Sequence, residues 1–147
     1  MRATEFINES VSYTQMREQD IVAVARQAFA GLYPDVKLYA KPVNDSIGFS
    51  TDEEGAGIAS AYALGGAVKD EFYLTVNAYA WDDAMNVVVE DATAGEYKGA
   101  VTAILKALFE TGERLFKSTT RELVIKHNAN YDAWSTIANR LGAELVD

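Results

Sequence analysis

Hydrophobic residues recur at helical spacing in three segments of the chain, residues 17–33, 98–116 and 131–141. In each segment the apolar side chains follow the i, i+3, i+4, i+7 pattern that forms one stripe along a helix. Gly142, directly after the third segment, is typical of a helix stop. The sequence therefore predicts three amphipathic helices. In the second helix we expect these residues to face inward: Val101, Ile104, Leu105, Leu108, Phe109, Leu115 and Phe116.

The stretches between these helices favour strands, because β-branched and aromatic residues are frequent in them. Residues 71–81 are the strongest example, and residues 86–90 follow closely. Residues 36–40 and 47–50 flank a Pro-Val-Asn-Asp corner and predict a hairpin. Connections among the middle strands are too short for crossover helices, so we expect antiparallel pairing there. Further short strands are expected at 10–16, 58–64, 123–126 and 144–146.

A helix separates strand 86–90 from strand 123–126, which is the order of a β–α–β unit. These two strands are therefore predicted to be parallel neighbours. A chain of 147 residues suits one domain. We predict a single α/β domain over residues 1–147, with a mixed, mostly antiparallel sheet, a C-terminal parallel β–α–β unit and helices on both faces.

The net charge of −9 narrows the functional classes. Direct nucleic-acid binding depends on Lys and Arg neutralising phosphates, so we do not expect it. With no cysteine and one histidine, His127, the chain has no disulfide and no cysteine nucleophile, and we predict no metal site. No apolar run is long enough to span a bilayer and the first residues lack the apolar core of a signal peptide, so we expect a cytoplasmic protein. An acidic anti-defence or DNA-mimicking protein is a weaker alternative.

A more specific pattern lies at the end of the chain. Residues 121–142 read RELVIKHNANYDAWSTIANRLG: a short apolar run, a corner with Asn128 and Asn130, an amphipathic helix and a glycine. With the order of the other predicted elements, this resembles the GNAT superfamily of N-acetyltransferases over most of the chain. A full domain of that family continues into another strand. The resemblance thus implies a GNAT-like fold that is truncated at its C-terminus, with an edge open to a second copy or a protein partner.

The resemblance implies acetyl-CoA as the cofactor. The family binds its pyrophosphate on a Gln/Arg-x-x-Gly-x-Gly/Ala loop, where backbone N–H groups meet the phosphates at a helix N-terminus. The apolar helix positions place Glu96, Gly99 and Val101 on that motif, and a second register puts Lys98 in the basic position. The cofactor-binding residues implied are Tyr97, Lys98, Gly99, Ala100, Val101 and Asn128.

For catalysis, the resemblance implies a carboxylate near the end of strand 86–90 as the general base. Glu90 and Asp91 are the candidates, and a carboxylate shielded from water can have its pKa raised into a useful range. The first hypothesis is an N-acyltransferase that acts on an unknown amine acceptor. Members of the family often use a tyrosine in the last helix as the general acid toward the departing thiolate. In this chain the corresponding position is Ala138. The alternative is therefore a catalytically inactive GNAT-like protein with a structural or assembly role, for example a phage virion-associated protein.

Overall fold

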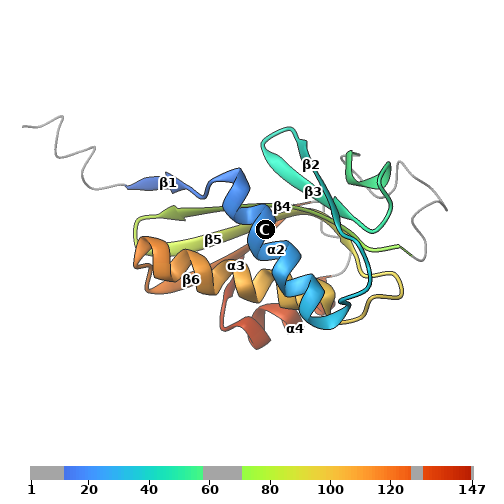
Figure 1. Cartoon of the computed structure of the whole chain (residues 1–147). Helices are drawn as coiled ribbons and strands as arrows, with labels where there is room; N and C mark the ends of the chain where they lie inside the picture. Colours follow the sequence, from blue (N-terminus) through green and yellow to red (C-terminus); the bar gives the residue numbers. More distant parts are fainter. Residues whose placement is uncertain (1–11, 58–70, 127–130, 147) are drawn as a thin grey trace, which may run out of the picture.

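The computed structural model describes residues 12–57, 71–126 and 131–146, which form a mixed α/β fold (Figure 1). In this part of the chain a seven-stranded sheet packs against three α-helices. The strands are β1 (Tyr13–Gln15), β2 (Tyr39–Val43), β3 (Ser46–Ser50), β4 (Tyr73–Trp81), β5 (Ala84–Thr93), β6 (Thr120–Ile125) and β7 (Glu144–Val146). The helices are α2 (Glu18–Leu32), α3 (Ala100–Phe116) and α4 (Tyr131–Leu141), and η1 (Gly55–Gly57) is a single 3-10 turn.

The strand order is β2-β3-β4-β5-β6-β7, and β1 pairs with the C-terminal end of β4, residues 79–81. Pairing is antiparallel from β1 and β2 through β5. It becomes parallel between β5 and β6, where Val87 lies opposite Leu123, and between β6 and β7. The predicted β–α–β unit and the mostly antiparallel sheet are therefore confirmed.

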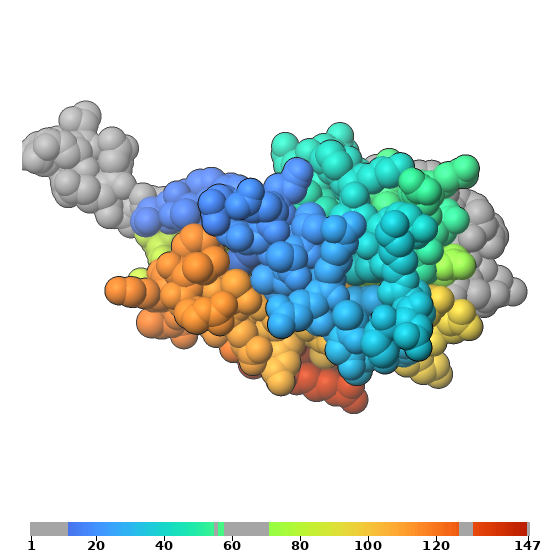
Figure 2. All heavy atoms as spheres, in the orientation of Figure 1, coloured from blue at the N-terminus to red at the C-terminus, as the bar shows by residue number. Residues whose placement is uncertain are grey.

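One hydrophobic core joins the helices to the sheet. The alternation along β4 and the residue before it directs Phe72, Leu74, Val76 and Ala78 into this core. Helix α2 contributes the buried Ile21, Ala25 and Phe29, and α3 contributes Ile104, Leu105, Leu108 and Phe109. Figure 2 shows α2 and α3 side by side on this face of the molecule. The hydrophobic stripes read from the sequence are the surfaces that pack.

The three helices described share one face of the sheet, whereas the sequence predicted helices on both faces. Arg121 of β6 shows this directly, because it bonds Glu113 of α3 and the carbonyl of Leu141 at the end of α4. The physical reason is the strand order. Both β–α–β connections step across the sheet in the same direction, so two right-handed crossovers place their helices on the same side.

Three further expectations are corrected. Leu115 is half exposed, at 50%, and the buried position on that turn of α3 belongs to Gly112, which packs on Met85. Strand β2 spans 39–43 rather than 36–40, and the predicted hairpin turns at Asn44 and Asp45, the last two residues of the Pro-Val-Asn-Asp corner, where Asn44 adopts the left-handed conformation with φ of 54°. Strand β5 is longer than 86–90 at both ends. The strand predicted at 58–64 lies outside the described residues.

Candidate functional site

The site begins with a β-bulge in β5. Thr75 of β4 lies opposite Asp91, but the next residue, Val76, lies opposite Val89, so Glu90 is an extra residue in β5. Val76 and Val89 face the helices in the core. Cross-strand partners share a face, so Asp91 lies with Thr75 on the opposite face, and the bulge lets Glu90 lie there too. The two carboxylates predicted as candidate bases are therefore brought to one face of the sheet.

The parallel pairing of β5 and β6 ends directly beside this bulge. Their last pair is Val89 with Ile125, and the N–H of Lys126 still donates to the carbonyl of Val89 at 2.9 Å. Beyond that point Glu90 reaches across to Lys126, with 3.0 Å between Oε2 and Nζ. The ion pair thus marks the end of the parallel pairing.

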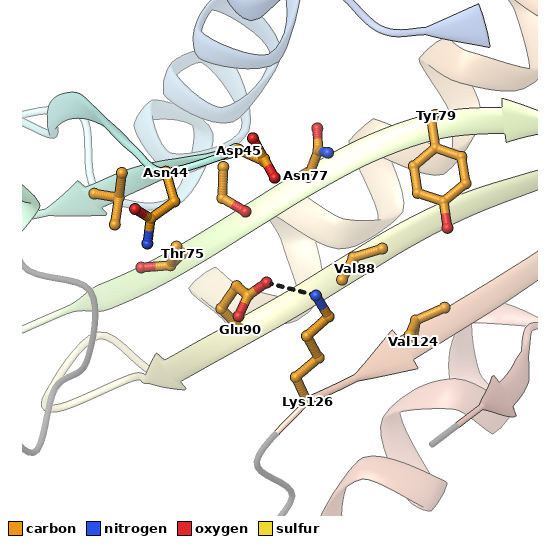
Figure 3. Close-up of a pocket in the computed structure, with 11 residues that line it drawn as sticks. Asn44, Asp45, Thr75, Asn77, Tyr79, Val88, Glu90, Val124 and Lys126 are labelled. Carbon is orange, nitrogen blue, oxygen red and sulfur yellow. Dashed lines mark ion pairs between the residues drawn. The ribbon is translucent and has the colours of Figure 1, made fainter. Parts of the chain in front are cut away.

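A hollow of about 250 Å³ lies over this ion pair, on the face away from the helices. None of the residues that line it comes from a described helix. Figure 3 shows Glu90 and Lys126 pointing toward one another, with β4 side chains and the turn between β2 and β3 around them. The polar and charged lining residues are Asn44, Asp45, Ser46, Thr75, Asn77, Tyr79, Glu90 and Lys126.

A second hollow of about 430 Å³ adjoins the first and shares Asn44, Asp45, Ser46 and Asn77 with it. An amide pair fixes its wall. The Nε2 of Gln15 donates to Oδ1 of Asn77 at 2.6 Å, and Nδ2 of Asn77 donates back to Oε1 of Gln15 at 3.2 Å. The two hollows therefore form one polar surface across β1, β4 and the β2–β3 turn.

Aromatic rings border this polar surface. The hydroxyl of Tyr13 donates to Oε1 of Gln15 at 2.9 Å, which holds its ring 5.2 Å from that of Tyr79 and 6.0 Å from that of Trp81. Tyr13 and Trp81 remain about half exposed. Burial raises the pKa of Tyr79, and the nearby Tyr13 and Glu122 raise it further. Tyr79 is therefore an uncharged phenol at neutral pH.

The predicted cofactor residues lie at the start of α3. Gly99 precedes the helix with φ of 84°, a left-handed conformation that favours glycine. The N–H groups of Val101 and Thr102 donate to no carbonyl in the described part of the chain, while Tyr33 donates its hydroxyl to the carbonyl of Lys98 at 2.8 Å. The helix start therefore offers two N–H groups beside an exposed lysine.

Side chains at this helix start divide into two groups. Ala100 and Val101 are buried in the core, so only their backbone can meet a ligand. The ring of Tyr97 packs against Phe29 and Tyr33, with centroids 5.8 and 5.1 Å away. Burial raises the pKa of Tyr97, and the carboxylates of Glu71 and Glu96 raise it further. The ring of Tyr97 is thus packed against α2 in an acidic setting, and its role toward a cofactor stays a prediction.

Several residues of this site were missed by the sequence reasoning. Lys126 read only as the end of a strand, and the turn at Asn44 and Asp45 read only as a corner. Their proximity to Glu90 depends on strand register and on the bulge, neither of which leaves a local signal. Asn128, predicted as a cofactor contact, lies outside the described residues.

Comparisons with known proteins return no family model, no curated protein and no solved structure that matches the chain. Within the described ranges, no three side chains of the metal-binding types gather into a possible ion site. No described helix is both long and apolar enough to cross a membrane.

Proposed function

We propose that the protein is an N-acyltransferase of GNAT-like fold that uses acetyl-CoA and acylates an amine. One observation carries the proposal: the parallel pairing of β5 and β6 ends beside Glu90, at the same edge of the sheet where α3 begins. The carboxyl ends of parallel strands form that edge, and ligands of α/β sheets bind there. The end of the parallel pairing, a carboxylate and a helix N-terminus are thus combined at one end of the β–α–β unit.

The start of α3 fits a pyrophosphate in three respects. Gly99 lets the backbone turn with a positive φ, the N–H groups of Val101 and Thr102 lack described backbone acceptors, and Lys98 is exposed next to them. The helix dipole favours an anion at this position. The carboxylate of Glu96 opposes it, since it adds negative charge beside the same turn.

When bound, acetyl-CoA supplies an activated acyl group. In this proposal Glu90 accepts a proton from the attacking amine, because Glu90 lines the hollow beside the end of the parallel pairing. Asp91, on the same face, adds negative charge that attracts an ammonium acceptor to the site, and transfer of its proton to Glu90 leaves the neutral amine that can attack. Tyr73 lies behind them, and its phenol accepts a hydrogen bond of 2.8 Å from the hydroxyl of Thr75.

Thermal unfolding in the presence of acetyl-CoA tests the proposal. A ligand that binds only the native state raises the melting temperature, because it stabilises that state. The added stability is about 2.7 kcal/mol when the ligand concentration is a hundred times its Kd. Lys98→Glu reverses the charge beside the helix start, and Lys106→Glu makes the same change on an exposed position of α3.

We expect a shift with the wild-type protein and with Lys106→Glu, and a smaller shift with Lys98→Glu. Glu96→Gln removes an opposing charge, so it is expected to enlarge the shift. No shift at millimolar acetyl-CoA would rule out the acyltransferase. An equal loss in both lysine variants would mean that overall charge, and not this helix start, governs binding.

A second candidate is a non-catalytic GNAT-like assembly protein, for example one associated with a virion. Two observations favour it. Tyr13 and Trp81 expose half of their surface on the open face, and such aromatic residues commonly anchor protein interfaces. Strand β7 ends the strand order, so no described strand pairs with its outer edge. Light scattering after gel filtration is expected to show a dimer or a larger assembly, and a monomer at all concentrations would count against this candidate.

A further inference from the structure

The lining of the hollow over Glu90 is suited to a positively charged group. Asp45 and Glu90 line it, and Glu122 lies near Tyr79 at its border. Ser46, which is only 5% exposed, lines both hollows.

Lys126 is the single cation among the described residues that line this hollow. Its ammonium lies 3.0 Å from Glu90, but its side chain is 53% exposed. A lysine side chain has a flexible stem with four carbons, so the ammonium can move into solvent without disturbing β6. The ion pair therefore shows where an ammonium group binds in this hollow, and Lys126 itself can leave that position.

We propose that the hollow binds a primary alkylammonium group, which displaces the ammonium of Lys126 from Glu90. The bound amine would be the acceptor of the acyl transfer, so this role rests on the proposed function. The binding itself needs no acetyl-CoA. Lys126 acts as an internal competitor that occupies the carboxylate until a ligand amine replaces it.

Each part of the ligand has a matching group. The carboxylates of Asp45 and Glu90 neutralise the ammonium, and the hydroxyl of Ser46, another lining residue, can accept a remaining N–H bond. The ring of Tyr79 offers a face for a cation and for the alkyl stem. A volume of about 250 Å³ is below that of a drug-sized pocket, and therefore fits one amine arm rather than a large ligand.

An anionic ligand is the competing interpretation, and it predicts the opposite role for Lys126. If the hollow received a phosphate or a carboxylate, Lys126 would be its anchor, and removing the lysine would weaken binding. If it receives an ammonium, removing the lysine frees Glu90 and strengthens binding. The sign of the effect of Lys126→Met therefore separates the two ligand chemistries.

The test is a calorimetric titration of the full chain without acetyl-CoA, at constant ionic strength, with two probes. Spermidine represents a free polyamine, and Nα-acetyl-lysine amide represents a lysine side chain of a protein. Lys126→Met and Glu90→Gln are compared with Lys106→Met and Glu110→Gln, which make the same charge changes at exposed positions of α3. The probe that binds identifies the source of the amine.

We expect Lys126→Met to tighten amine binding roughly fivefold and Glu90→Gln to weaken it by a similar factor, the scale of one partly exposed charge pair. The two control variants are expected to bind as the wild-type protein does. Any of three results would overturn the inference. Lys126→Met could bind the amine more weakly than the wild-type protein, or Glu90→Gln could bind it as tightly as the wild-type protein. The third result is that neither probe binds to Lys126→Met at about 10 mM. Because acetyl-CoA is absent, a failure here leaves the melting experiment with acetyl-CoA unaffected, and the reverse also holds.

Discussion

Lys126 and Glu90 form an ion pair of 3.0 Å that serves the site more than the fold. Their side chains are 53% and 28% exposed, and surface pairs of this kind are each worth about 0–1 kcal/mol. We therefore predict that Lys126→Met and Glu90→Gln each change the free energy of unfolding by less than about 1 kcal/mol. Urea denaturation followed by circular dichroism measures this. A loss of more than about 2 kcal/mol in either variant would show that the pair is structural.

Gly112 and Met85 give a sharper prediction about packing. A Cβ at Gly112 would overlap the thioether of Met85, so in Gly112→Ala the fully buried Met85 side chain has to shift within a packed core. Overpacking costs about 1–3 kcal/mol, which exceeds the gain of about 1 kcal/mol from the better helix former. Gly31→Ala in α2 is the matched control, because no atom lies within 4 Å of its added Cβ.

In chemical denaturation, Gly112→Ala is expected to lose stability and Gly31→Ala to gain roughly 0.5 kcal/mol. If both variants gain stability to the same extent, then α3 does not pack on β5 as described.

Arg121 and Glu113 hold α3, β6 and α4 together. The guanidinium donates to both oxygens of Glu113 at 2.6 and 2.8 Å and to the carbonyl of Leu141 at 2.9 Å, and these bonds raise its pKa. Lysine cannot reproduce this planar fork. Arg121→Lys is predicted to cost about 1–3 kcal/mol of unfolding free energy.

Arg17→Met provides the comparison, because Arg17 is 71% exposed in its ion pair with Asp20. This substitution is expected to cost roughly 0.5 kcal/mol of unfolding free energy or less. Equal losses in Arg121→Lys and Arg17→Met would contradict the bridging role of Arg121.

Tyr73 predicts a loss of stability at alkaline pH. Burial raises the pKa of its phenol above 10.0, and nearby Asp91 raises it further, against the hydrogen bond from Thr75. The unfolded chain therefore releases this proton at a lower pH than the folded chain, so stability is complete below about pH 10 and falls as the pH rises toward the folded pKa. Tyr73→Phe is expected to flatten that fall. Denaturation curves from pH 8 to 11 measure it, and identical slopes for both proteins would contradict the assignment.

The sequence predicted those parts of the fold that local periodicity determines. Helix α4 was placed at its observed bounds, since its apolar residues and Gly142 are local signals. Leu115 was misassigned because a hydrophobic stripe cannot show that Gly112 admits Met85 on that turn. The common side of the helices follows from strand order, which periodicity does not encode.

The site was predictable only in part for the same reason. Glu90 and Asp91 were identified from their place at a strand end, but their shared face results from a bulge that depends on pairing with β4. Lys126 lies 36 residues from Glu90 in sequence, and only the parallel register of β5 and β6 brings the two together. Tertiary pairing, rather than residue type, creates the hollow.

Two-dimensional NMR of the isotope-labelled protein during an acetyl-CoA titration tests the central claim most directly, because it reports both binding and its location. The account predicts that the amide signals of Val101 and Thr102 shift most, and that those of Glu90 and Lys126 shift with the same dissociation constant. Lys106, farther along α3, is the internal control and is expected to remain unchanged. A spectrum without shifts at millimolar acetyl-CoA, or with shifts confined to other parts of the chain, would contradict the proposed acyltransferase.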